Sequence, residues 1–230
     1  MEISGAASKY NYNAFFTKNE NDGNKIFSEI LEKKNHSNMS AKQFLSTLTP
    51  NELYTIQKAN GLANSIRVNI LSGEGAENLF LRPLGTDKLV DLNNDGVVEI
   101  GEGKGMFFPP PNAPASVKSA WEEATKGMSF GEKSHIMAKF RAEQLSANFF
   151  TGSDGLTHLH EIGEAGWQNI FGSTVESYLN LFDKIIYNID HPLAAPDSKQ
   201  RKIDEFVKRT LSNVIDKIPR RSIYEAAMPK

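Results

Sequence analysis

From residue 114 onward, the apolar positions of the chain recur every three or four residues, which is the spacing of one face of an α-helix. Four such stripes follow one another along the chain. The sequence therefore predicts four amphipathic helices whose apolar faces form the core of a helical bundle. The stripes are Val117, Trp121, Ala124 and Met128; Met137, Phe140, Leu145 and Phe149; Val175, Tyr178, Leu179, Phe182, Ile185 and Ile186; and Ile203, Phe206, Val207, Leu211, Val214 and Ile215.

Helix starts are indicated by the capping box, in which a Ser or Thr is followed three residues later by Glu or Gln. The pattern occurs at Ser40 with Gln43, Thr49 with Glu52, Ser129 with Glu132 and Ser173 with Glu176. Before residue 90 the predicted elements are shorter. They are a helix with Ile26, Phe27, Ile30 and Leu31 on one face, helices at 41–46 and 50–59, an extended segment at 66–71 and a helical turn at 76–81.

The fold class that these patterns predict is all-α: a multi-helix bundle with short extended segments around an acidic loop at residues 91–102. Three adjacent prolines at 109–111 force an extended path and mark the best internal boundary. We expect a flexible leader at 1–24, a helical region at 25–112 that ends in the acidic loop, and a helical bundle at 113–230. The last two parts could form one continuous domain.

Length and composition narrow the class of protein. With 230 residues, 39% of them hydrophobic and 23% charged, the chain can bury a core without covalent cross-links. Its net charge of −2 creates no field that attracts nucleic acid, so no nucleic-acid partner is expected. The chain has no cysteine, which excludes disulfides, thiol catalysis and zinc sites with Cys ligands.

The chain shows no signal peptide and no membrane span. Its start lacks an apolar signal core, and no stretch approaches the roughly 18 apolar residues that a transmembrane helix needs. We therefore expect a cytoplasmic protein by default, while export without a cleaved signal stays open. The sequence indicates no oligomeric state.

The acidic loop at residues 91–102 reads D-L-N-N-D-G-V-V-E-I-G-E. Calcium prefers six to eight oxygen ligands at about 2.4 Å, which one loop can supply if oxygen-bearing side chains alternate while the backbone wraps the ion. Gly96 lies where the chain must turn sharply with positive φ, and Val98 is expected to point into packing. The predicted ligands are the side chains of Asp91, Asn93 and Asp95, the carbonyl of Val97, Glu99 directly or through water, and both carboxylate oxygens of Glu102.

These twelve residues resemble the calcium loop of the EF-hand family, D-x-[DN]-x-[DN]-G-x5-E, at every fixed position. The flanks differ from that family, because Pro83 and Gly85 leave room for barely one helical turn before the loop, and glycines and prolines follow it. The loop therefore resembles dockerin-like modules that lack an exiting helix. EF-hand sensors work by changing the angle between two helices. The resemblance thus implies a structural or local ordering role for Ca²⁺.

Two further groups of residues are candidates for metal binding. A partner loop at 150–161 would place Gly155 at the sixth position, but Phe150 and Gly152 supply no side-chain oxygen at the first and third. The other group is His158, His160, Glu161 and Glu164, which has the residue types of a transition-metal site but lacks an HExxH helix. Two histidines at this spacing share a face only on a strand.

Our first hypothesis for function is a non-enzymatic calcium-binding protein in which the ion orders the loop and supports the binding of a protein partner. Phe107 and Phe108, beside the prolines, could dock such a partner or pack into the core. The alternative is an enzyme with a metal-assisted site near His158, His160 and Glu161 and a structural calcium ion. No residue is assigned a catalytic role.

Overall fold

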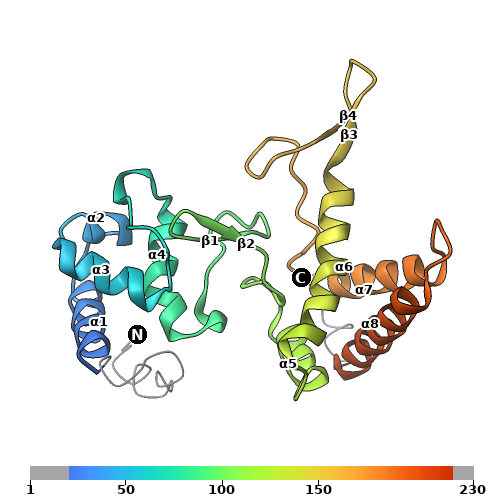
Figure 1. Ribbon diagram of the computed structural model, residues 1–230, viewed down its shortest axis with the longest axis horizontal. Coiled ribbons are helices and arrows are strands. Elements are labelled where there is room, and N and C mark those ends of the chain that lie inside the picture. The colour runs from blue at the N-terminus through green and yellow to red at the C-terminus, as the bar shows by residue number, and fades with distance from the viewer. Residues whose placement is uncertain (1–20, 220–230) are drawn as a thin grey trace, which may run out of the picture. The chain divides into compact units, whose positions relative to one another are not determined.

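The computed structural model describes residues 21–219 and shows a mostly helical protein (Figure 1). The chain forms two compact units. Unit 1 contains the residues up to Leu92 together with Val97–Gly105, and unit 2 contains Asn93–Gly96 and the chain from Met106 onward. The sequence placed the boundary between residues 112 and 113, whereas the chain passes into unit 2 after Gly105. Residues 1–20 of the expected leader lie outside the described residues, and a helix begins at Asn21.

Unit 1 combines short helices with one β-hairpin. The capping boxes predicted at Ser40 and Thr49 are both formed and start helices at the next residue, which confirms these two predictions. The segment at 66–71 forms a 3-10 turn where an extended segment was expected. The elements are α1 (Asn21–Asn35), α2 (Ala41–Leu45), α3 (Pro50–Ala59), η3 (Val68–Ile70), α4 (Gly73–Leu81), η4 (Arg82–Leu84), η5 (Thr86–Lys88), β1 (Val98–Ile100) and β2 (Gly103–Gly105).

The core of unit 1 lies between α1, α3, α4 and strand β1. Strand β1 pairs antiparallel with β2, which follows it directly, so the chain leaves the acidic loop as a hairpin and not as a helix. Ile26 was expected on the buried face of the first helix but is 41% exposed. The buried apolar side chains include Phe27, Ile30, Leu31, Phe44, Leu45, Ile56, Leu79, Phe80 and Val98.

Unit 2 is built mainly from four helices. Three of these helices begin after a residue whose side chain caps them, and the predicted box of Ser129 with Glu132 is confirmed. The next box lies one residue later than predicted, at Thr174 with Ser177. Helices α7 and α8 lie side by side, and the β3–β4 hairpin extends from the C-terminal end of α6 (Figure 1). The elements are α5 (Ala115–Ala124), α6 (Phe130–Asn148), β3 (Phe149–Thr151), β4 (Thr157–Leu159), α7 (Val175–Asp190) and α8 (Ser198–Lys217).

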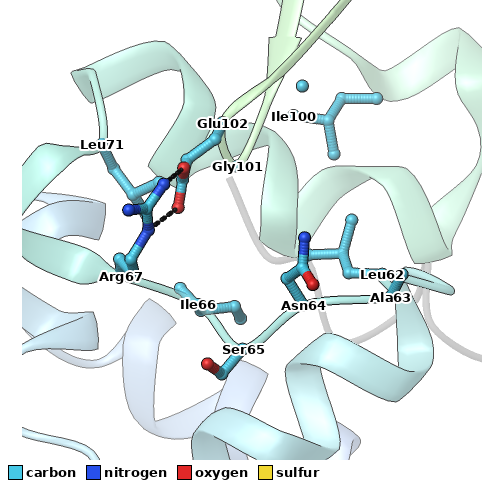
Figure 2. Close-up of a pocket in the computed structure, with 11 residues that line it drawn as sticks. Leu62, Ala63, Asn64, Ser65, Ile66, Arg67, Leu71, Ile100, Gly101 and Glu102 are labelled. Atoms are coloured by element: carbon cyan, nitrogen blue, oxygen red, sulfur yellow. Dashed lines mark hydrogen bonds and ion pairs between the residues drawn. The ribbon is translucent and has the colours of Figure 1, made fainter.

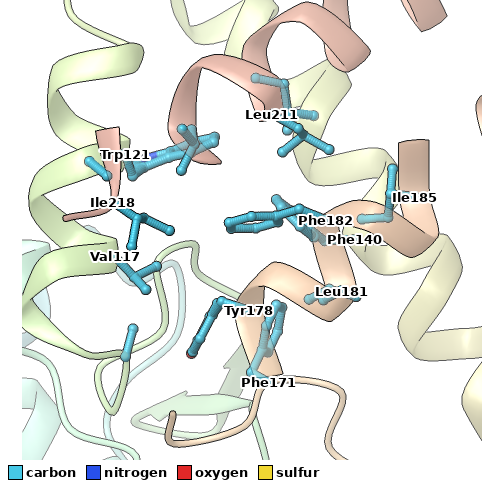
Figure 3. Packing of buried hydrophobic residues seen from close by; sticks show 14 of the residues in the cluster. Val117, Trp121, Phe140, Phe171, Tyr178, Leu181, Phe182, Ile185, Leu211 and Ile218 are labelled. Atoms are coloured by element: carbon cyan, nitrogen blue, oxygen red, sulfur yellow. The ribbon is translucent and has the colours of Figure 1, made fainter. Parts of the chain in front are cut away.

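Aromatic side chains fill the centre of unit 2 (Figure 3). Phe108 stacks on Phe140 with ring centroids 4.1 Å apart and meets Trp121 edge to face at 4.7 Å. The sequence left two roles open for Phe108, and the structure places it against the core, so its ring does not form a docking surface. The stripes predicted for α5, α7 and α8 supply most of the other buried residues, among them Val117, Tyr178, Phe182, Leu211 and Val214.

Helix α6 buries a different face from the one that its apolar residues predict. Leu145 and Phe149 are 46% and 54% exposed, so their expected place in the core is wrong. The buried positions are Ile136 and Phe140 together with two polar residues, Gln144 and Asn148. These four residues are spaced at i, i+4, i+8 and i+12, which keeps them on one side of the helix.

In the part of the chain that the structure describes, no helix is both long and apolar enough to cross a membrane.

Candidate metal centre

The backbone of the acidic loop turns through the left-handed region at Asn94, Gly96 and Gly101. Asn94 has φ 55° and Gly96 has φ 79°, as predicted for Gly96. The side chain of Asn93 bridges the first turn, because its Oδ1 accepts the amide of Asp95 at 3.1 Å and its Nδ2 donates to Asp95 Oδ2 at 2.9 Å. A side chain at residue 96 would meet both an unfavourable φ and the amide group of Asn169. The position therefore requires glycine.

Within unit 2, the loop residues Asn93–Gly96 are held by side chains from elsewhere in that unit. The indole Nε1 of Trp167 donates to the carbonyl of Asp95 at 2.9 Å, and Nδ2 of Asn169 donates to the carbonyl of Asn94 at 2.9 Å. Asn112 donates to the side-chain oxygen of Asn94 at 2.9 Å. The acceptors of these three bonds are oxygen atoms other than those predicted to bind the ion.

The segment that carries Trp167 and Asn169 is fixed by the buried polar face of α6. Asn148, which is fully buried, accepts the amide of Gln168 at 2.7 Å and donates to its carbonyl at 3.0 Å. Gln144 accepts the amide of Ile170 at 3.1 Å and donates to the carbonyl of Gln168. Buried amide side chains of this kind satisfy backbone groups that would otherwise be unpaired. This network explains why α6 buries polar residues.

Within unit 1, strand β1 and the start of the loop are held against α4. Asp91 is 5% exposed, Val97 3% and Val98 1%, which agrees with the expectation that Val98 points into packing. Nδ2 of Asn78 donates to the carbonyls of Val90 and Glu99, each at 2.8 Å, and its Oδ1 accepts the amide of Val90 at 2.9 Å. One side chain of α4 thus ties the start of the acidic loop to strand β1.

Glu74 is a buried acidic residue of this site that the sequence did not reveal. It is 5% exposed, and its two carboxylate oxygens accept the amides of Leu92 and Glu99 at 2.7 Å each. Burial raises the pKa of Glu74 above its ordinary value, the two amide hydrogen bonds counter this rise, and the nearby charges of Asp91 and Glu99 add to it. Glu74 therefore fastens residues 92 and 99 to the same helix.

The carboxylates at the ninth and twelfth loop positions are engaged by other residues of unit 1. Glu99 accepts a hydrogen bond from the hydroxyl of Ser72 and forms an ion pair with Lys104 at 3.2 Å. Two of the three guanidinium nitrogens of Arg67 donate to Glu102, with Nε donating to Oε1 at 2.9 Å. The hydrogen bonds from Arg67 hold the pKa of Glu102 below its ordinary value.

Among the described residues, no three His, Cys, Asp or Glu side chains lie close enough together to hold a metal ion. This finding includes the predicted ligands Asp91, Asp95, Glu99 and Glu102. The donor set itself suits a hard cation, because it consists of carboxylate, amide and carbonyl oxygens. For a bidentate glutamate to close the shell, Glu102 must leave Arg67.

The two histidines of the second candidate group have different acidic partners. Nε2 of His158 lies 2.9 Å from both carboxylate oxygens of Asp154, while the ring of His160 stacks on Phe150 at 4.1 Å and lies 3.7 Å from Glu164. His158 lies in the exposed strand β4 and His160 directly follows it, and the residues at 149–159 form a two-stranded hairpin. The hairpin takes the place of the partner loop considered at 150–161.

Comparison with protein-family models, with curated proteins and with solved structures found no match for this chain.

Proposed function

We propose that this chain is a calcium-binding protein that holds one Ca²⁺ ion through Asp91, Asn93, Asp95, Val97, Glu99 and Glu102. The observation that carries the proposal is the alternation of oxygen donors around Gly96, whose φ of 79° is the turn that this motif requires. Asn93 and Asp95 form a local turn of the kind that this motif uses, because the side chain of Asn93 accepts the amide of Asp95.

The negative charge of the loop explains what a bound calcium ion would do. The four carboxylates of Asp91, Asp95, Glu99 and Glu102 repel one another when they are gathered, and a divalent cation offsets that repulsion. Arg67 and Lys104, which pair with Glu102 and Glu99, offset part of this negative charge. For Glu102 to bind calcium with both oxygens, it must leave the guanidinium of Arg67. Calcium binding would therefore break the contact between Glu102 and Arg67.

The hairpin that follows the loop supports a structural role in place of a sensor role. Strand β1 begins inside the loop and turns straight into β2. EF-hand sensors expose a groove when their exiting helix swings, and no such helix follows this loop. We infer that Ca²⁺ orders the loop and the β1–β2 hairpin, and that any protein partner is affected through that local ordering.

Calorimetric titration of the full chain with CaCl₂ tests the proposal. We expect one binding site, weakened at least about tenfold in Asp91→Ala and in Glu102→Gln because each variant loses a charged ligand. The matched control is Asp87→Asn, which removes a nearby exposed carboxylate outside the motif. Calcium should also raise the melting temperature by mass action. Absence of binding heat together with unchanged melting at millimolar Ca²⁺ would overturn the proposal.

A further inference from the structure

A cavity of about 500 Å³ lies in unit 1 beside the last residues of the acidic loop. Its volume falls within the range of pockets that bind small molecules, roughly 300–1,000 Å³. In Figure 2 the Arg67–Glu102 ion pair lies at one side of this cavity, and Leu62 and Ile100 lie toward the other side. The lining residues are Leu62, Ala63, Asn64, Ser65, Ile66, Arg67, Leu71, Ile100, Gly101, Glu102 and Gly103.

The lining combines aliphatic side chains with one pair of opposite charges. Leu62, Ile66, Leu71 and Ile100 supply the apolar surface. Among the described residues that line the cavity, the charged ones are Arg67 and Glu102, and these two neutralise each other. The side chain of Arg67 is 65% exposed, so its guanidinium is accessible from solvent while it holds Glu102.

Glu102 cannot serve Arg67 and a calcium ion in the same way at once. Arg67 binds it through two donor atoms, one on each carboxylate oxygen. A bidentate ligand at the twelfth loop position also uses both carboxylate oxygens, and it directs them at the ion. If Glu102 turns to Ca²⁺, Arg67 keeps its charge and its planar fork of donors but loses the carboxylate that they matched.

We propose that Arg67 and this cavity bind a carboxylate carried on a compact aliphatic group, and that calcium opens the site by drawing Glu102 away from Arg67. The carboxylate takes the place of Glu102 on the guanidinium, and the aliphatic group packs against Leu62, Ile66 and Ile100. The charge of the lining changes from neutral to positive when Glu102 leaves, which selects an anion over a neutral ligand. The calcium control rests on the proposed function, whereas the carboxylate site itself does not.

The two ligands should favour each other. Calcium removes the carboxylate that blocks Arg67, and the bound acid gives Arg67 a replacement partner, so that Glu102 is released for the ion. Because coupling between two binding sites is reciprocal, the acid must tighten calcium binding by the same factor by which calcium tightens acid binding. Equal factors show that both titrations measure one linkage, and variants of Glu102 and Arg67 test whether the exchange of Glu102 causes it.

The probe is 4-methylpentanoate. Its binding to the full ¹⁵N-labelled chain is measured by NMR titration, once in EDTA and once in saturating CaCl₂. We expect affinity at least about tenfold higher with calcium, a coupling of about 1.4 kcal/mol, and no binding of the neutral analogue 4-methylpentan-1-ol. Acetyl-Gly-Gly-Leu is titrated in parallel. Binding of this peptide as well as the acid assigns the site to peptide C-termini, and binding of the acid alone assigns it to small free acids.

Variants separate this inference from the proposed function. Glu102→Ala frees Arg67 without any ion, so it should bind 4-methylpentanoate in EDTA as tightly as the wild-type chain does with calcium. Arg67→Ala should abolish acid binding in both conditions, and Arg67→Lys should weaken it because the fork is lost while the charge remains. Lys58→Ala removes a cation that lies over the Tyr54 ring and outside the cavity lining, so it should leave acid binding unchanged.

The experiments distinguish failure of the proposed calcium-binding function from failure of the carboxylate site. If calcium does not bind the wild-type chain but Glu102→Ala binds the acid, the proposed function fails and the carboxylate site stands. If a folded Glu102→Ala variant does not bind the acid, the site is refuted whether or not calcium binds. Unchanged acid affinity in Arg67→Ala would refute it as well.

Discussion

Replacing Glu74 with glutamine changes one atom and should loosen the acidic loop. In the wild-type chain, the two oxygens of Glu74 each accept one backbone amide, from Leu92 and from Glu99, at 2.7 Å. Glutamine keeps the shape of the side chain but has one carbonyl oxygen. Its NH₂ group must face the other amide, so two donors meet where a donor met an acceptor.

The magnitude follows from the lost bond and the removed charge. A hydrogen bond to a charged group contributes about 1.5–3 kcal/mol, and that contribution is lost at one amide. Burial raises the pKa of Glu74, which shows that its charged form is incompletely solvated, so removing the charge recovers part of the loss. We expect a net destabilisation of about 1–2 kcal/mol, which corresponds to a roughly 5–30-fold change in the local opening equilibrium.

Amide hydrogen exchange measured by NMR is the assay, because it reports opening residue by residue. The exchange rate of the Leu92 amide or of the Glu99 amide should rise by that factor in Glu74→Gln. The control is Glu77→Gln on the same helix, where the carboxylate is partly exposed and its nearest cation, Lys34, lies 4.0 Å away. If both amides exchange at the wild-type rate in Glu74→Gln, Glu74 does not fasten the loop and the reasoning is wrong.

Three further predictions concern other parts of the chain. Gly96→Ala should destabilise the loop by about 1–3 kcal/mol, because φ at this position is positive and the methyl group would meet Asn169. Thermal unfolding with and without calcium measures this loss of stability, and an unchanged melting temperature would contradict the prediction. Phe140→Ala should lower the free energy of unfolding by about 3–5 kcal/mol, measured with urea, since the ring is fully buried; a loss below 1 kcal/mol would show that the site is poorly packed. The hydrogen bond from His158 holds the pKa of Asp154 below its ordinary value of 3.8. The pair therefore stabilises the folded hairpin fully above pH 3.8, and this stabilisation is lost as the pH falls through the lower pKa of the folded state. In an NMR titration, His158→Gln should return the pKa of Asp154 toward 3.8, and an unchanged pKa would contradict the assigned cause.

Helix starts were predictable because their chemistry is local. Ser40, Thr49 and Ser129 each bond to a residue three positions later, so the capping pattern contains both partners. The buried face of α6 was not predictable from apolar residues alone. Gln144 and Asn148 are buried because they bind the backbone of residues 168–170, and that segment is distant in sequence.

The same distinction applies to the acidic loop. The turn at Gly96 and the burial of Val98 could be read from the order of residues in the loop itself. The residues that hold the loop could not, since Trp167 bonds to a carbonyl 72 positions earlier and Arg67 pairs with a carboxylate 35 positions later. No short motif signals contacts over such separations.

The arrangement of Glu102 in the presence of calcium tests the central proposal most directly. A crystal structure of the full chain grown with CaCl₂, with anomalous diffraction to identify the ion, should show one calcium peak within the loop. We expect oxygens of Asp91, Asn93, Asp95, Val97 and Glu102 at about 2.4 Å from it, with Glu99 bound directly or through water. Both carboxylate oxygens of Glu102 should face the ion and no longer contact Arg67. A loop without an anomalous peak, in which Arg67 still holds Glu102, would contradict the account.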